Sequence, residues 1–289
     1  MLRDLLKEGG LYTLVSLLTR GVNLFLIPFY TQHFSPQDYG MLDIITIFTL
    51  IVSNIFSLQM NQGMGRYVGE PKEGELSKIA YTSTAVWFSN GVLLAISLVL
   101  VLFPTPFINL LSEEAKIPLD TFRLAILTMF LTGVFYLFNV QLRFMRKVKT
   151  ITLLSLTHAL AGTALIFFFV LVKGFSIESI YISYNIILPI LIIIQIYILK
   201  DQLAFQFNTK RLKKMLSYSL PLIPASIAVI LMNFTDRIYI KELLNFQALG
   251  IYAMAGKFSS IITMVVVVSV WPSDHLSLKN NTVFPQKKR

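Results

Sequence analysis

The sequence predicts an all-α protein, a polytopic transmembrane helical bundle of about eight spans, and three observations support this fold class. First, the 289-residue chain is 55% hydrophobic and only 14% charged, whereas a soluble domain carries about 25% charged residues. Second, runs such as Ile177 to Leu199 stay apolar over about 20 residues, the length that a helix needs to cross the hydrocarbon core. Third, Lys and Arg gather in alternate connections between these runs, as the positive-inside rule requires.

Eight segments are long enough and apolar enough to be spans, and each is expected to form one helix. In chain order they cover residues 11–32, 40–60, 80–103, 121–141, 151–172, 177–199, 216–240 and 249–270. The first follows a short basic region, as the apolar core of a signal peptide does, but it has no small-residue cleavage site and the other spans follow it. We therefore expect it to remain in the membrane as the first helix.

These spans divide into two sets. Residues 1–199 are expected to form one complete six-helix lobe. Residues 200–215 follow as a basic cytoplasmic linker, whose segment KRLKKML has apolar residues at helical spacing, typical of an amphipathic helix lying in the lipid headgroups. Residues 216–270 supply the first two helices of an incomplete second lobe, and residues 271–289 form a polar, basic tail.

Most of the 25 Lys and Arg residues fall on one side of the predicted membrane. That side holds Arg3, Lys7, Arg66, Lys72, Lys78, Arg143, Arg146, Lys147, Lys149, Lys200, Lys210, Arg211, Lys213, Lys214, Lys279, Lys287, Lys288 and Arg289. The opposite connections carry little more than Lys116, Lys173 and Lys241. The rule then places both termini in the cytoplasm, and the net charge of +10 indicates anionic membrane lipids, not nucleic acid, as a partner.

The residues that most enzymes and metal sites use are scarce. The chain has no cysteine, which excludes disulfides, thiolate catalysis and Cys-ligated metals. Its three histidines, His33, His158 and His275, lack metal-ligand spacing. No phosphate-binding loop, nucleophile elbow, HExxH motif or dinucleotide fingerprint is present. We therefore expect no catalytic residue, no metal and no cofactor, and a protein that is not an enzyme.

Two segments far apart in the chain form a weak internal repeat. FSPQDYGMLDIITIFTLI, residues 34–51, aligns with LNFQALGIYAMAGKFSSI, residues 244–261, so that Gly40 meets Gly250 and Phe48 meets Phe258 at one common offset. Each copy is an outer turn that opens a helix running inward. Parallel repeats of this kind build many transporters, with the substrate site between the halves.

Charged residues within the predicted spans are costly in lipid, so each needs a partner or a function. Arg20 lies midway along the first span with Asn23 about one turn away, and it either contacts an anion in a cavity or bonds neighbouring helices. Asp43 is close to the outer end of the second span, where it can be an interfacial residue in the first turn that the helix dipole favours. Asp236 and Lys257 lie at equal depth on either side of a turn, and form either an ion pair or part of a substrate or ion site.

Further polar residues in the spans have simpler interpretations. Arg123 and Arg237 are expected to extend their long side chains to the outer interface. The uncharged residues are expected mostly to form hydrogen bonds between helices, worth about 0.6 kcal/mol each in membranes. They comprise Asn54, Gln59, Asn90, Asn139, Gln141, Asn185, Gln195 and Asn233.

Several motifs together resemble those of the polysaccharide biosynthesis flippases. Their N-terminal hallmark is similar to FSPQDYGMLDI together with SLQMNQGMGRYVGE (57–70). Their seventh helix is similar to LKKMLSYSLPLIPASIAVILMNFTDRIYI (212–240), and their eighth helix is similar to ALGIYAMAGKFSSI (248–261). The resemblance covers nearly all of residues 1–272. It points to the O-antigen and capsule repeat-unit exporters (Wzx type) of the multidrug, oligosaccharidyl-lipid and polysaccharide exporter superfamily.

The resemblance implies a two-lobed helical transporter in a bacterial or archaeal cell (inner) membrane. It implies export of a polyprenyl-diphosphate-linked oligosaccharide for lipopolysaccharide or capsule synthesis, with the polysaccharide polymerase and export machinery as further partners. Cationic residues of such flippases are thought to hold the diphosphate, and Arg20 and Lys257 are the matching candidates. Asp43 and Asp236 are then candidates for charge balance or ion coupling.

The C-terminus departs from the family pattern, in which further helices follow a Trp-Pro segment. Here Trp271 and Pro272 precede the polar tail, so we expect a truncated form. Three alternatives stay open: a drug/cation antiporter of the same superfamily, a membrane polymerase or ligase, and a non-functional remnant. An antiporter cavity would favour carboxylates, and a polymerase would need a larger external loop than residues 104–120.

Overall fold

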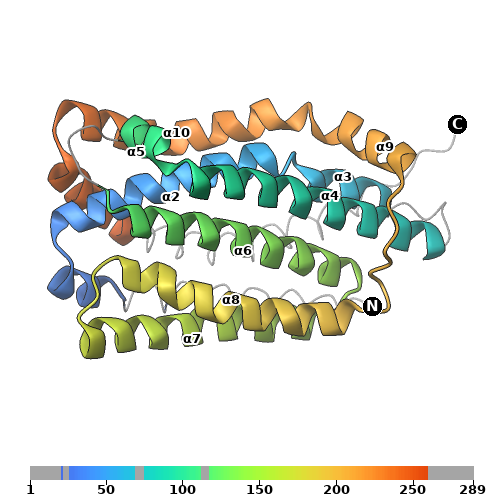
Figure 1. The fold of residues 1–289 in the computed structure, drawn as a ribbon, viewed down its shortest axis with the longest axis horizontal. Coiled ribbons are helices and arrows are strands. Elements are labelled where there is room, and N and C mark those ends of the chain that lie inside the picture. The colour runs from blue at the N-terminus through green and yellow to red at the C-terminus, as the bar shows by residue number, and fades with distance from the viewer. Residues whose placement is uncertain (1–20, 22–25, 69–74, 112–116, 260–289) are drawn as a thin grey trace, which may run out of the picture.

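The computed structural model describes residues 21, 26–68, 75–111 and 117–259, and every regular element among them is an α-helix. The long helices lie side by side along the long axis of the molecule (Figure 1). In chain order the helices are α2 (Pro36–Phe56), α3 (Met60–Val68), α4 (Glu75–Leu102), α5 (Pro104–Leu111), α6 (Leu119–Phe144), α7 (Val148–Lys173), α8 (Glu178–Leu199), α9 (Thr209–Ser219) and α10 (Leu222–Leu243). Residues 26–33 and 246–259 are also helical.

Six of the described helices are long and apolar enough to cross a membrane, namely α2, α4, α6, α7, α8 and α10. They correspond to the second to seventh spans expected from the sequence, so the prediction of an all-α polytopic bundle is confirmed. The first and eighth expected spans, 11–32 and 249–270, extend beyond the described residues. The chain is a multi-pass membrane protein.

Side chains and backbone geometry explain where several helices begin and end. The hydroxyl of Ser35 accepts from the backbone N–H of Asp38, and the Asp38 carboxylate accepts from the backbone of Ser35, a capping box that starts α2. Asn245 caps the helix of residues 246–259 with its side chain alone, since its Oδ1 accepts from the N–H of Ala248 at 2.8 Å. α7 ends at Gly174, whose φ of 68° is the left-handed conformation that glycine favours.

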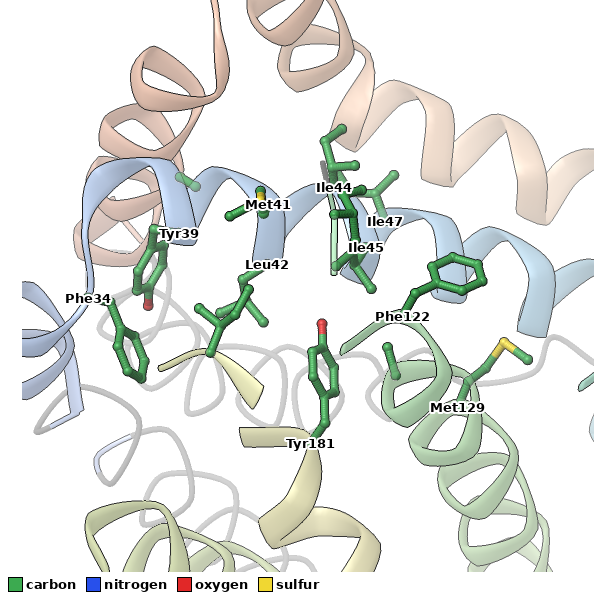
Figure 2. Close-up of a cluster of buried hydrophobic side chains, with 14 of the residues drawn as sticks. Phe34, Tyr39, Met41, Leu42, Ile44, Ile45, Ile47, Phe122, Met129 and Tyr181 are labelled. Atoms are coloured by element: carbon green, nitrogen blue, oxygen red, sulfur yellow. The ribbon is translucent and has the colours of Figure 1, made fainter. Parts of the chain in front are cut away.

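The core lies mainly between α2, α6 and the helices beside them. Ile45 on α2 and Phe122 on α6 are fully buried, and Figure 2 shows them close to Tyr181 at the start of α8. A second cluster joins α3, α4, α6, α8 and α9 around Met64, Leu142 and Met215. α10 packs on α2, but most of its side chains remain accessible, since Ile230 is its one buried residue. One face of α10 therefore stays open beside α2.

The second expected span, residues 40–60, is not one continuous helix. α2 ends at Phe56, Leu58 and Gln59 adopt positive φ values of 51° and 48°, and α3 begins at Met60. Two consecutive non-glycine residues in the left-handed region are uncommon and end the helix within the apolar stretch.

The basic linker contains a helix that packs against α3. Its helix, α9, runs from Thr209 to Ser219, and its apolar residues Leu212 and Met215 are buried against α3. The contact is close because a Cβ added at Gly63 of α3 would lie 2.9 Å from the carbonyl oxygen of Met215. Leu212 and Met215 are therefore covered by protein, and the position of this helix at the lipid headgroups stays a prediction.

Candidate functional site

A partly buried ion pair joins α2 to α10. Nη1 of Arg237 donates to Oδ1 of Asp43 at 2.5 Å, and the two side chains are only 21% and 12% exposed. The second carboxylate oxygen of Asp43 is buried and has no hydrogen-bond partner among the described residues. Arg237 therefore turns to a carboxylate on α2, in place of the outward extension expected for it, while the roles considered for Asp43 stay predictions.

Lys257 contacts two tyrosines, which come from two different helices. Its Nζ donates to the hydroxyl of Tyr39 on α2 at 2.6 Å. It also lies 4.8 Å from the ring centre of Tyr39 and 5.6 Å from that of Tyr30 in the helix of residues 26–33. Cation–π contacts of this kind stabilise a cation away from bulk water. The structure thus holds a lysine ammonium between the described part of the first expected span and α2.

Asp236 has a different partner from the one considered for it. It is exposed, and it accepts hydrogen bonds from the hydroxyl of Tyr252 and from the backbone N–H of Arg237. The carboxylate that pairs with α10 is therefore Asp43 of α2, bound by Arg237, and the pair considered between Lys257 and Asp236 is not among the described ion pairs. The contact between Tyr252 and Asp236 joins α10 to the helix of residues 246–259. Arg20 lies outside the described residues.

The two glycines aligned by the internal repeat meet in the structure. A Cβ added at Gly40 would lie 2.0 Å from the carbonyl oxygen of Phe246, and one added at Gly250 would lie 1.8 Å from the carbonyl oxygen of Pro36. The contact is reciprocal, because each glycine faces the residue four positions before the other. A two-fold relation between copies produces such a contact. The matching helix caps at Ser35 and Asn245 agree with this symmetry.

A cavity of about 590 Å³ lies farther along α2, at its break with α3. Residues of α2, α3, α4, α6 and α10 surround it, and its described lining contains no charged side chain. The polar members of the lining are Ser53, Asn54, Ser57, Gln59, Asn61, Gln62, Ser89, Asn90, Thr132, Tyr136 and Ser226. Its volume falls in the range of about 300–1,000 Å³ usual for small-molecule sites.

The cavity gives new significance to three residues expected to be interhelical hydrogen-bonding groups. Asn54 does bridge helices, since its Oδ1 accepts from Ser226 of α10 at 2.6 Å and from Gln59 at 3.1 Å. However, Asn54, Gln59 and Asn90 also line the cavity. The feature of the sequence that indicates this cavity is the high density of amide and hydroxyl side chains between residues 53 and 62. An average of hydropathy over the whole span does not reveal it.

Other uncharged polar residues do form the expected interhelical bonds. Gln195 of α8 donates to Oδ1 of Asn139 on α6 at 3.2 Å, and Asn185 of α8 donates to the carbonyl oxygen of Leu124 on α6 at 3.0 Å. These bonds fix α6 against α8. Within the described parts of the chain, no group of three or more His, Asp or Glu residues is placed to hold a metal ion.

The sequence and the fold were compared with those of known proteins. A family model described as "Polysaccharide biosynthesis protein" matches residues 5–271. No curated protein matches the sequence. Among solved structures, the fold is similar to that of a mutant of the Vibrio cholerae MATE transporter VcmN, with a TM-score of 0.65 and 14% identity. The match covers 92% of this chain and 63% of that one, so the chain spans less than two thirds of the transporter's length.

Proposed function

Since the chain belongs to the polysaccharide biosynthesis protein family, we propose that it exports a polyprenyl-diphosphate-linked oligosaccharide across a bacterial or archaeal cell membrane. The exported units would serve O-antigen, lipopolysaccharide or capsule synthesis. The observation that carries the proposal is the placement of Lys257, an ammonium group held between Tyr30 and Tyr39 within a membrane protein. Ionisable residues in such positions commonly mark substrate or ion pathways.

Lys257 is the proposed contact for the lipid diphosphate, together with Arg20. The diphosphate is the one strongly anionic part of such a substrate, and a lysine binds phosphate well as a point charge. Asp43 is proposed to balance the local positive charge, since it already pairs with Arg237 beside this site. Asp236, which is exposed on α10, is proposed as the group available for ion coupling.

The same proposal assigns the two ends of the bundle. The turn between α6 and α7 and the connection from α8 to α9 lie at one end (Figure 1), and they carry Arg146, Lys147 and Lys200. We place this end in the cytoplasm by the positive-inside rule, with anionic headgroups as its contacts. The polysaccharide polymerase and export machinery are proposed as protein partners.

Export provides the direct test. In a flippase-deficient bacterial strain, expression of this chain should restore surface polysaccharide, and Lys257→Met should abolish the restoration. Lys173→Met is the matched control, because Lys173 is an exposed lysine at the end of α7. Failure of the wild-type chain to restore polysaccharide, despite correct membrane insertion, would contradict the proposal.

A drug/cation antiporter is the second candidate, since the fold is similar to that of a MATE transporter. A site for organic cations would favour carboxylates, whereas the described lining of the cavity has none. Energy-dependent efflux of a cationic dye, retained in Lys257→Met, would favour the antiporter over the flippase.

A further inference from the structure

The uncharged cavity at the break between α2 and α3 has the chemistry of a carbohydrate site. We propose that it binds the sugar part of the substrate and selects neutral sugars, such as hexoses and N-acetylhexosamines, over uronic acids. This inference rests on the proposed function, because it concerns the glycan that the lipid diphosphate carries. From Tyr39, which contacts Lys257, to Asn54 at the cavity is about 22 Å along α2 at about 1.5 Å per residue. A diphosphate at Lys257 therefore leaves room for several sugars before the cavity.

The functional groups of the lining match those of a neutral sugar. An amide side chain can donate and accept hydrogen bonds at once, as a sugar hydroxyl also does. Asn54 on α2, Asn61 on α3 and Asn90 on α4 bring such amides from three helices. A uronate would lose its hydration here without meeting a cation in the described lining, and burying an unpaired charge is costly.

The amide of Asn54 has a hydrogen-bond donor available for a ligand. Oδ1 of Asn54 accepts from Gln59 and Ser226, which orients this amide and leaves its Nδ2 as the remaining donor. A sugar hydroxyl in the cavity can accept from this donor.

An aromatic ring adds an apolar surface to the same wall. Tyr136 on α6 lines the cavity and is 51% exposed. Its hydroxyl accepts from Nδ2 of Asn61 at 3.3 Å, which links its position to that of α3. Sugar rings carry both hydroxyl groups and apolar C–H groups, so a tyrosine beside several amides suits both parts.

The backbone of the break brings the amides together. Leu58 and Gln59 have positive φ values of 51° and 48°, a conformation that is unfavourable for an L-residue. Such strain is often found at ligand sites, where the surrounding structure maintains it. Here the break places Gln59, Asn61 and Gln62 around the cavity.

Binding of three defined lipids to the full chain in nanodiscs tests the inference. The first probe is a polyprenyl diphosphate carrying a linear neutral oligosaccharide that is long enough to span about 22 Å and ends in N-acetylglucosamine. The second carries the same oligosaccharide ending in glucuronic acid, and the third is the lipid diphosphate without sugar. We expect the N-acetylglucosamine lipid to bind about tenfold more tightly than the other two. Asn90→Leu should remove this difference. Asn233→Leu should keep it, because Asn233 is exposed and bonds only within α10.

The outcomes separate this inference from the proposed function. Equal binding of all three lipids by the wild-type chain would overturn the sugar site while leaving diphosphate binding intact. Equally tight binding of both glycosylated lipids, each above the bare lipid, would overturn the selection against acidic sugars. Absence of binding for all three lipids would overturn the proposed function itself. These comparisons use the wild-type chain, so they do not depend on the folding of a variant.

Discussion

Gly40 and Gly250 pack backbone to backbone where α2 and the helix of residues 246–259 cross near their N-termini. The obstacles to a side chain at these positions are carbonyl oxygens, that of Phe246 at 2.0 Å and that of Pro36 at 1.8 Å from the added Cβ atoms. A backbone oxygen within a capped helix cannot move aside as the end of a flexible side chain can. The contact thus requires glycine in both copies of the repeat.

Gly250→Ala should destabilise the protein by about 1–3 kcal/mol, the usual cost of forcing an extra carbon into a packed contact. The measurement is the free energy of unfolding in detergent. Gly91→Ala is the matched control, since a Cβ at Gly91 of α4 meets nothing within 4 Å. Equal stability of the two variants would show that the helices do not approach this closely.

Breaking the ion pair between Asp43 and Arg237 should also be costly. Asp43→Asn leaves the Arg237 guanidinium largely buried without its carboxylate, and loss of one partner of a buried pair costs about 3–5 kcal/mol. The double variant Asp43→Asn with Arg237→Gln should recover part of this loss, because no unpaired charge remains.

The control for the ion pair lies at the start of α6. Asp120 and Arg123 are 3.9 Å apart and their side chains are 91% and 44% exposed, so Asp120→Asn should change stability by less than about 1 kcal/mol. If Asp43→Asn behaves like Asp120→Asn, the pair on α2 and α10 contributes no more than a surface contact.

The sequence predicted the spanning helices because apolar length is a property of each segment alone. It also predicted the repeat, whose aligned glycines prove to be in contact. It did not predict the break after Phe56, because no glycine or proline interrupts the chain there and the break depends on packing around the cavity.

The pairing of charges could not be obtained from depth alone. Asp236 and Arg237 are adjacent in the chain and lie at nearly equal depth, but successive residues of an α-helix point about 100° apart. The face that α10 turns toward α2 decides which of them meets Asp43. Packing between helices sets that face, and it brings Arg237 to the carboxylate while Asp236 remains exposed.

The packing of α9 on α3 gives a further prediction. Met215 is fully buried between these helices, so Met215→Ala should cost about 2–5 kcal/mol and increase amide hydrogen exchange across Thr209–Ser219. Met232→Ala is the control, because Met232 on α10 is 83% exposed. Unchanged exchange in Met215→Ala would indicate that α9 is held by lipid and not by α3.

The turn between α6 and α7 offers a stabilising change. Arg146 is exposed and has a φ of 55°, in the left-handed position that follows the end of a helix and favours glycine. Arg146→Gly should therefore raise the free energy of unfolding by about 1 kcal/mol. Arg143→Gly should lower it by about the same amount, because Arg143 is exposed but helical, and glycine is unfavourable there. Both variants remove one arginine from the same end of the bundle, so opposite signs must come from the backbone. Equal effects of the two changes would contradict the left-handed conformation of Arg146.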